Sequence, residues 1–213
     1  MGVRVDKFVF LGLVSGELED PLNHRGRGAA LTLAALYSLA LPLPTIFHNL
    51  RFSKEYESAW VLQIAPLENF ARFTGGLAKA VVYKFMLPAL LLMGAVFFLR
   101  WQNPLHALLH FIAAVLVVAI ANQACAMIQL RRIPFSEPAG RGESFGAVAP
   151  MMAAVSFVAG FLAAIHFVAA VSLWGLLGYL GCLALALAIL TYIRSIRIPR
   201  DAKSDRHVNS EVA

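Results

Sequence analysis

The sequence predicts an all-α integral membrane protein: a polytopic helical bundle of about five transmembrane helices with a cytoplasmic amphipathic connection. Its residues are 60% hydrophobic and only 14% charged, whereas soluble domains average about 45–50% apolar and about 25% charged residues. A mean hydropathy of +0.72 excludes a disordered chain. The apolar residues gather in runs of about 20, the helix length that crosses a hydrocarbon core about 30 Å thick. None of the runs shows the period-2 alternation of a membrane barrel strand.

Five apolar runs are long enough to cross a membrane, and they cover residues 28–47, 81–99, 105–128, 145–167 and 170–193. Pro42 and Pro44 should end or kink the first run. The second and third runs are joined by residues 100–104 alone, and the fourth is followed almost at once by the fifth. Such short links predict two helical hairpins within one transmembrane domain, residues 28–213.

The positions of Lys and Arg predict the orientation of the bundle. Residues 48–80, the connection at 129–144 and the basic C-terminal tail at 194–213 together carry twelve Lys and Arg, and the links on the opposite side carry only Arg100. We therefore expect these three segments, and the C-terminus, on the cytoplasmic side of the cell (inner) membrane. The excess of positive charge is then an orientation signal rather than a sign of a nucleic-acid partner.

The N-terminal segment, residues 1–27, does not fit this pattern, because it carries Arg4, Lys7, Arg25 and Arg27 on the side predicted to lie outside. Its apolar run at 8–14 is too short to span a membrane. Three interpretations remain open: a surface or re-entrant helix, the remnant of a truncated span, and a poor signal peptide that is removed.

The long connection at 48–80 is expected to form two short amphipathic helices. Apolar residues recur at helical spacing on both sides of a break at Ala65-Pro66, with charged residues between them. Gly75-Gly76 should then release the chain into the second span. The two helices suit either a position at the membrane interface or a docking surface for another protein, and both can hold together.

Catalytic and nucleotide-binding motifs are absent from the sequence, including GxxxxGK[ST], GxGxxG, HExxH, CxxC and GxSxG. We therefore expect that the chain is not an enzyme and that it binds no cofactor. His106 and His110 share a helix face, and His166 should lie at a similar depth. These three histidines are weak candidates for a metal or haem site, because no acidic or cysteine co-ligand accompanies them. Asn122, Gln123 and Gln129 are expected to hydrogen-bond to neighbouring helices.

The run EYESAWVLQIAPLENFARFTGGLAKAVVYKFMLPALLL resembles the ABC-2 type exporter permeases. In that family a span is followed by a cytoplasmic amphipathic segment with a proline break, a polar turn, a glycine and a lysine at the mouth of the next span. The matching residues here are Glu55, Ala65, Pro66, Glu68, Arg72, Gly76 and Lys79. The chain departs from the family in showing five spans rather than six, and in separating its glycine and lysine.

The resemblance implies a permease subunit of an ABC-type exporter that couples to a separate ATP-binding subunit. The residues expected to contact that partner are Glu55, Trp60, Pro66, Glu68, Arg72 and Lys79. It also implies pairing in the bilayer, either as a homodimer or with a second permease. The alternatives are a metal- or haem-binding membrane redox or assembly subunit, and an accessory structural membrane protein.

Overall fold

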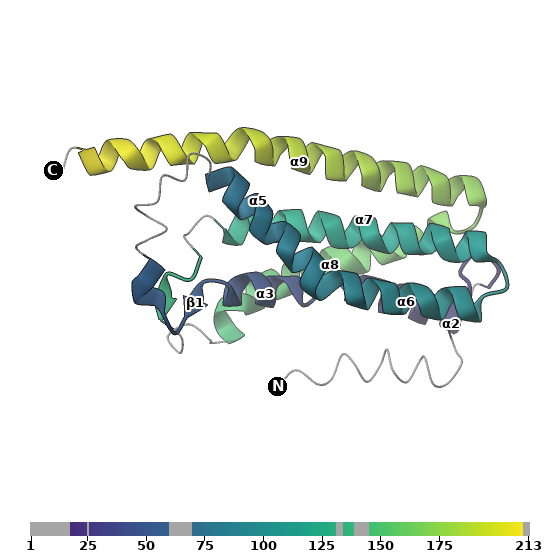
Figure 1. Ribbon diagram of the computed structural model, residues 1–213. Coiled ribbons are helices and arrows are strands. Elements are labelled where there is room, and N and C mark those ends of the chain that lie inside the picture. The colour runs from purple at the N-terminus through teal and green to yellow at the C-terminus, as the bar shows by residue number, and fades with distance from the viewer. Residues whose placement is uncertain (1–17, 25, 60–69, 131–133, 139–144, 211–213) are drawn as a thin grey trace.

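A computed structural model describes residues 18–24, 26–59, 70–130, 134–138 and 145–210. Within these ranges the chain is an all-α bundle, as the sequence predicted (Figure 1). Five of its helical stretches are long and apolar enough to cross a membrane: Arg27–Asn49, Phe73–Arg100, Pro104–Gln129, Val148–Ala169 and Leu173–Arg194. Their length and composition are those of a multi-pass membrane protein.

The first span is divided in two by its prolines. Helix α2 covers Arg27–Ser38 and helix α3 covers Leu43–Asn49, with a turn between them. Pro44 occupies the first turn of α3, where its missing N–H leaves no helical hydrogen bond unmade. The predicted break at the two prolines is therefore confirmed.

The second span is longer than expected. Helix α5 (Phe70–Val81) continues through a π-helical turn, η2 (Val82–Met86), into α6 (Leu87–Arg100). Pro88 cannot donate to the Lys84 carbonyl, which accounts for the widened turn just before it. The prediction that Gly75-Gly76 would release the chain from one element into the next is wrong, because both glycines lie inside α5. Flanking residues with good helix propensity carry the helix across them.

The last four spans are joined in pairs by two short links at one end of the molecule. Helix α7 (Pro104–Gln129) begins at Asn103, whose side chain accepts a hydrogen bond from the backbone N–H of Leu105. Helix α8 covers Phe145–Ala169 and helix α9 covers Leu173–Ser210, so the basic tail continues the last span as one helix. The tight links α6–α7 and α8–α9 confirm the predicted hairpins, and they define what we call the hairpin end (Figure 1).

The opposite end carries the only strands among the described residues, and we call it the strand end. Strand β1 (Phe52–Ser53) pairs in parallel with β2 (Glu137–Pro138), and a short 3₁₀ helix, η1 (Tyr56–Ala59), follows β1. An ion pair between Arg51 and Glu137 reinforces this pairing. The two connections that were predicted to share one side of the membrane are thus joined to each other.

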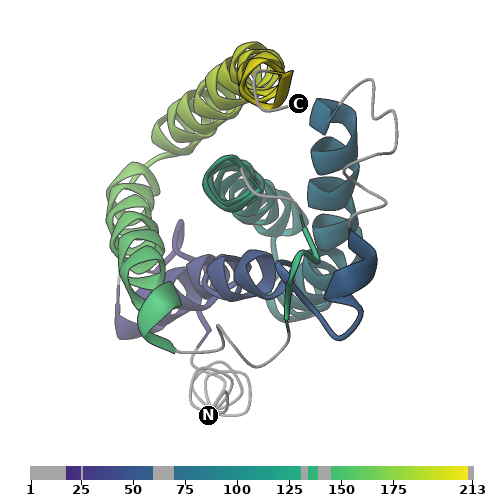
Figure 2. The ribbon, with the colours of Figure 1, turned by 90° about the vertical axis from the view of Figure 1, so that its left-hand side faces the viewer.

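Helix α7 lies at the centre of the bundle. Viewed along the bundle, the other helices surround it (Figure 2), and α7 contacts α2, α3, α5, α6 and α9. The predicted interhelical hydrogen bonds are confirmed: Asn122 donates to the Ala78 carbonyl of α5, Gln123 accepts from Arg194 of α9, and Gln129 donates to Met151 Sδ of α8. Burying α7 leaves much of α8 and α9 on the outside of the bundle.

Candidate functional site

A buried chain of polar side chains lies inside the hairpin end. We call it the His–Tyr cluster, and its members are Asp20, Tyr37, His106, His110, His166 and Tyr179. Ionisable groups within membrane-spanning segments are expensive to bury, so a connected set of them is a functional-site hypothesis by default.

Two imidazoles form the centre of the His–Tyr cluster. His110 Nδ1 lies 2.8 Å from His166 Nε2, and the two rings stack with their centroids 4.8 Å apart. Both side chains are fully buried, with 0% exposure. Trp101 closes one side with its ring edge against His110. One of the two facing nitrogens must therefore carry a proton and the other must accept it.

Two tyrosines extend the cluster towards the middle of the bundle. The Tyr37 hydroxyl lies 2.8 Å from His166 Nδ1 and 2.6 Å from the Tyr179 hydroxyl. Tyr179 also donates to the backbone carbonyl of Leu162, at 3.2 Å. Tyr179 stands six residues after the start of α9, which places its Cα about 9 Å along the helix from the hairpin end. The hydrogen bonds thus lead from the hairpin end into the apolar interior.

Asp20 connects the histidines to the surface. Its carboxylate accepts from His106 Nδ1 at 2.7 Å and lies 3.7 Å from His110 Nε2. The Leu22 backbone N–H and the Asn23 amide also donate to it. Burial raises the pKa of the Asp20 carboxyl, but the nearby His110 imidazole and the hydrogen bonds from His106 and Leu22 outweigh burial and hold that pKa below its ordinary value. Asp20 is therefore ionised at neutral pH.

The segment that carries Asp20 is held against the bundle by backbone contacts. Trp101 Nε1 donates to the Leu18 carbonyl at 3.4 Å, and the Thr32 hydroxyl donates to the Glu19 carbonyl at 2.9 Å. Residues 18–24 therefore close the hairpin end. The described residues of the N-terminal segment are placed by these contacts, whereas its apolar run at 8–14 lies outside the described residues.

The structure confirms that the three histidines lie together but corrects the reason for discounting them. The sequence indicated no acidic neighbour, yet Asp20 stands between His106 and His110. The contacts are hydrogen bonds among the side chains themselves. Within the described ranges, no group of three or more His, Cys, Asp or Glu is arranged to hold a metal ion.

Sequence reasoning missed Asp20, Tyr37 and Tyr179. The available signals were a carboxylate a few residues before the first span and two tyrosines well inside spans, away from the interfaces where tyrosine is common. Those signals are weak because they do not say which way a side chain faces.

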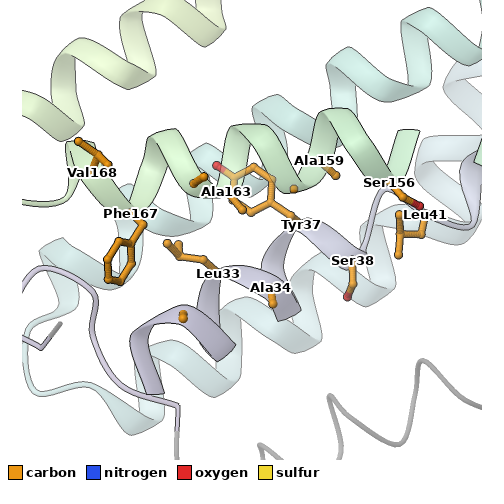
Figure 3. Close-up of a pocket in the computed structure, with 13 residues that line it drawn as sticks. Leu33, Ala34, Tyr37, Ser38, Leu41, Ser156, Ala159, Ala163, Phe167 and Val168 are labelled. Carbon is orange, nitrogen blue, oxygen red and sulfur yellow. The ribbon is translucent and has the colours of Figure 1, made fainter. Parts of the chain in front are cut away.

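A groove runs along the outside of the bundle between α2 and α8, and its volume is about 590 Å³. Most of its lining is small or apolar, as Figure 3 shows for Leu33, Ala34, Ala159 and Ala163. Tyr37 belongs to both features, because its ring lines the groove while its hydroxyl bonds to His166 and Tyr179.

Three of the residues expected to couple to a partner lie within the described residues. Glu55 and Lys79 are exposed, and Arg72 lies in α5. Trp60, Pro66 and Glu68 lie outside the described residues, as does the predicted break at Ala65-Pro66. Glu55 and Lys79 thus satisfy the first requirement of a docking role, which is a side chain that the rest of the bundle does not cover.

Beneath these exposed residues, α5 is fixed to its neighbours by buried polar contacts. Arg194 of α9 donates to Gln123 of α7 at 2.5 Å, and its guanidinium lies 3.8 Å from the position that a Cβ on Gly75 would take. Asn122 donates to the Ala78 carbonyl from the other side. Helices α5, α7 and α9 are therefore linked where α5 enters the bundle.

Comparisons with protein-family models, with curated proteins and with solved structures found no match to this chain.

Proposed function

We propose that this chain is the membrane-spanning permease subunit of an ABC-type exporter, coupled to a separate ATP-binding subunit through residues 48–80. The observation that carries the proposal is the unbroken helical path from Phe70 to Arg100. It joins the amphipathic connection at the strand end directly to the hairpin end, so a displacement of α5 moves α6 with it.

The contacts around α5 support transmission of that movement. Asn122 and Arg194 tie α7 and α9 to α5 at the point where it enters the bundle. The π-helical turn at Val82–Met86 supplies a local place for the helix to bend, because its hydrogen bonds are wider than those of an α-helix. A push on the docking surface would therefore reach three helices.

The distribution of charge supports a cytoplasmic position for the strand end, and with it a place in the cell (inner) membrane with the C-terminus inside. The segments rich in Lys and Arg belong to connections that meet at β1 and β2, and the Arg51–Glu137 ion pair keeps these connections together. Because the sequence holds no nucleotide-binding motif, the ATPase is a separate subunit on that side.

The exposure of α8 and α9 supports pairing with a second copy or a second permease. Only 11% of the apolar window of residues 148–169 and 17% of that of residues 173–194 is buried, against 50% for residues 27–49. Gly160, Gly178 and Gly181 have open space where a Cβ would stand. Small residues of this kind allow helices of neighbouring subunits to approach closely.

The proposal is tested by searching the neighbouring genes for an ATP-binding protein, co-expressing the full chain with it and reconstituting both in liposomes. Charge reversal in α5, by Arg72→Glu and Lys79→Glu, should lower the ATPase rate stimulated by the chain about tenfold, because each puts a repelling charge on the docking surface. The matched control is Gln102→Glu, which adds a negative charge at an exposed position of the hairpin end.

Two results would contradict the proposal: no ATP-binding protein copurifies with the chain, or both α5 variants stimulate the ATPase as well as the control does. Membrane insertion of each variant is checked by detergent extraction and size-exclusion chromatography. A loss of stimulation therefore reports on docking and not on folding.

A further inference from the structure

We propose that the His–Tyr cluster is a proton-binding site, in which the His110–His166 pair takes up one proton from the hairpin end while Asp20 serves as the counter-ion. This inference concerns a different end of the bundle from the ATPase surface, and it stands whether or not an ATPase partner exists. The ligand is the proton itself, and the reasoning rests on which atom can donate each hydrogen bond.

With both imidazoles neutral, one order of donors satisfies every link from Tyr179 to Asp20, and it leaves the contact of the Tyr179 hydroxyl with the Leu162 carbonyl without a proton. Tyr179 donates to Tyr37, and Tyr37 donates to His166 Nδ1. His166 Nε2–H then donates to His110 Nδ1, and His110 Nε2–H points to the Asp20 carboxylate. Every donor in this order points towards Asp20. The last link is the weakest, because His110 Nε2 and the Asp20 carboxylate oxygen are 3.7 Å apart.

The opposite order of donors is also possible, because the Tyr179 hydroxyl has a second acceptor. Tyr179 can donate to the Leu162 carbonyl instead, which lies 3.2 Å away. Tyr37 then donates to Tyr179, and its oxygen is free to accept from His166 Nδ1–H. Rotation of two hydroxyl groups is enough to make this change, because neither ring has to turn over.

Without an added proton, the reversed order would leave His110 Nε2 with a lone pair facing the Asp20 carboxylate, so keeping the proton on that nitrogen requires one proton more than the first order holds. His166 now carries an N–H on Nδ1, and a second proton lies between His166 Nε2 and His110 Nδ1, while His110 keeps its proton on Nε2. One N–H bond has formed, and the proton has left a water or hydronium at the surface. The pair gains a charge of plus one, which the Asp20 carboxylate balances across the contact to His110.

Asp20 is the charged group in contact with the His110–His166 pair, and it also gives protons a route from solvent to the pair. His106 is 19% exposed and Asp20 is 7% exposed, so a proton can pass from solvent to the carboxylate and on to His110. Among the described residues, the titratable or charged groups near the cluster are Glu19 and Asp20 before α2, Tyr37 in α2, Arg100 in α6, His106 in α7 and Tyr179 in α9. Helix α8 contributes only His166 itself.

The location of the pair gives proton uptake a structural consequence. The residues of the His–Tyr cluster come from the segment before α2 and from α2, α7, α8 and α9. Reversing the donors therefore changes contacts between four helices at once. In the neutral form the link from His110 to Asp20 is long, and His110 Nε2 has no hydrogen-bond partner within normal distance. Protonation strengthens this link because the donor becomes charged.

The experiment follows the ¹⁵N resonances of the imidazoles in the full chain, labelled with ¹⁵N-histidine and embedded in nanodiscs, between about pH 5 and pH 8. Each histidine resonance is assigned from the spectrum of the variant that lacks it. The expected result is that His110 and His166 change together and that the pair gains one proton in total. Among the described residues, His24 is exposed in the same N-terminal segment, makes no hydrogen bond or ring contact with the pair, and provides the internal reference.

Two variants test the counter-ion and the hydroxyl chain. Asp20→Asn should lower the protonated fraction of the pair at a given pH by about tenfold or more, because an opposite charge within contact distance is lost. Tyr37→Phe should also lower it, because His166 Nδ1–H then has no acceptor. His24→Asn should leave the pair unchanged.

Three outcomes would overturn the inference: His110 and His166 keep one protonation state throughout the pH range, the added proton is found on His106 alone, or Asp20→Asn and Tyr37→Phe both titrate like the unmodified chain. If Asp20→Asn does not fold, the Tyr37→Phe spectrum and the joint titration of the unmodified protein decide the question.

Discussion

Replacing Gly175 by alanine should open the α8–α9 hairpin. Gly175 lies in the first turn of α9, where its backbone N–H donates to the Ser172 hydroxyl. A Cβ added there would lie 2.4 Å from the Ala169 carbonyl oxygen and 3.2 Å from Ser172 Oγ. The first distance is well inside the 3.0 Å that real Cβ atoms keep from their neighbours. The obstructing atom is backbone, so no side-chain rotation relieves the contact.

The free energy of unfolding should fall by about 2 kcal/mol. Forcing extra volume into a packed site costs about 1–3 kcal/mol, and a clash between two backbone segments belongs at the upper end. Exchanging a helical glycine for alanine returns about 0.5–1 kcal/mol. Gly178 has nothing within 4 Å of its Cβ position, so Gly178→Ala on the same helix should be neutral or stabilising by that smaller amount.

The assay is equilibrium unfolding of both variants and the unmodified chain in mixed detergent micelles, followed by tryptophan fluorescence. The clash also moves the end of α8, where Ala170 N–H is bonded to the His166 carbonyl, so the His–Tyr cluster should loosen with it. If Gly175→Ala is as stable as Gly178→Ala, the tight turn does not constrain the hairpin and this reasoning fails.

Three further predictions concern the cluster and the core. Tyr37→Phe should lower the free energy of unfolding by about 1–2 kcal/mol, because buried His166 Nδ1 loses its hydrogen-bond partner. In the same micelle assay, Tyr83→Phe at an exposed position should change the free energy of unfolding by less than about 0.5 kcal/mol. The pKa of folded Asp20 lies below its ordinary value of 3.8. The contacts of its carboxylate therefore stabilise the fold fully above pH 3.8, and this stabilisation is lost as the pH falls through the lowered pKa. Thermal unfolding measured against pH should show the loss in the unmodified chain and not in Asp20→Asn. Gly94→Ala should cost about 1 kcal/mol because its Cβ would meet the Phe111 ring at 2.9 Å, and combining it with Phe111→Leu should recover most of that loss.

The sequence was sufficient to predict the five spans and most of their ends. Mean hydropathy within a window depends only on local composition, and prolines and short links mark where helices stop and start. It failed at Gly75-Gly76, where local turn signals were overridden by a helix that contacts α7 and α9 over its length. The strand pairing at Arg51 and Glu137 also had no local signal, because its two strands are two residues each.

The candidate site was likewise predictable in part from the sequence and depended in part on tertiary contacts. The spacing of His106 and His110 placed both on one face of a helix, and topology put His166 at the same end. The contribution of Asp20 was not visible, because nothing in a sequence says that a segment folds back under a hairpin. The coupling surface at the strand end stays a prediction that the ATPase measurements address.

What the sequence by itself determined is the number of apolar helices long enough to cross a membrane, because that number follows from runs of apolar residues. Only the tertiary structure decided that Tyr37, His166 and Tyr179 meet, with 129 and 142 residues separating Tyr37 from its two partners. The physical reason is rotation about the helix axis. Helices that are apolar all round carry no stripe to show which face turns inward, so the packing of α2, α8 and α9 against their neighbours sets the direction of these three side chains.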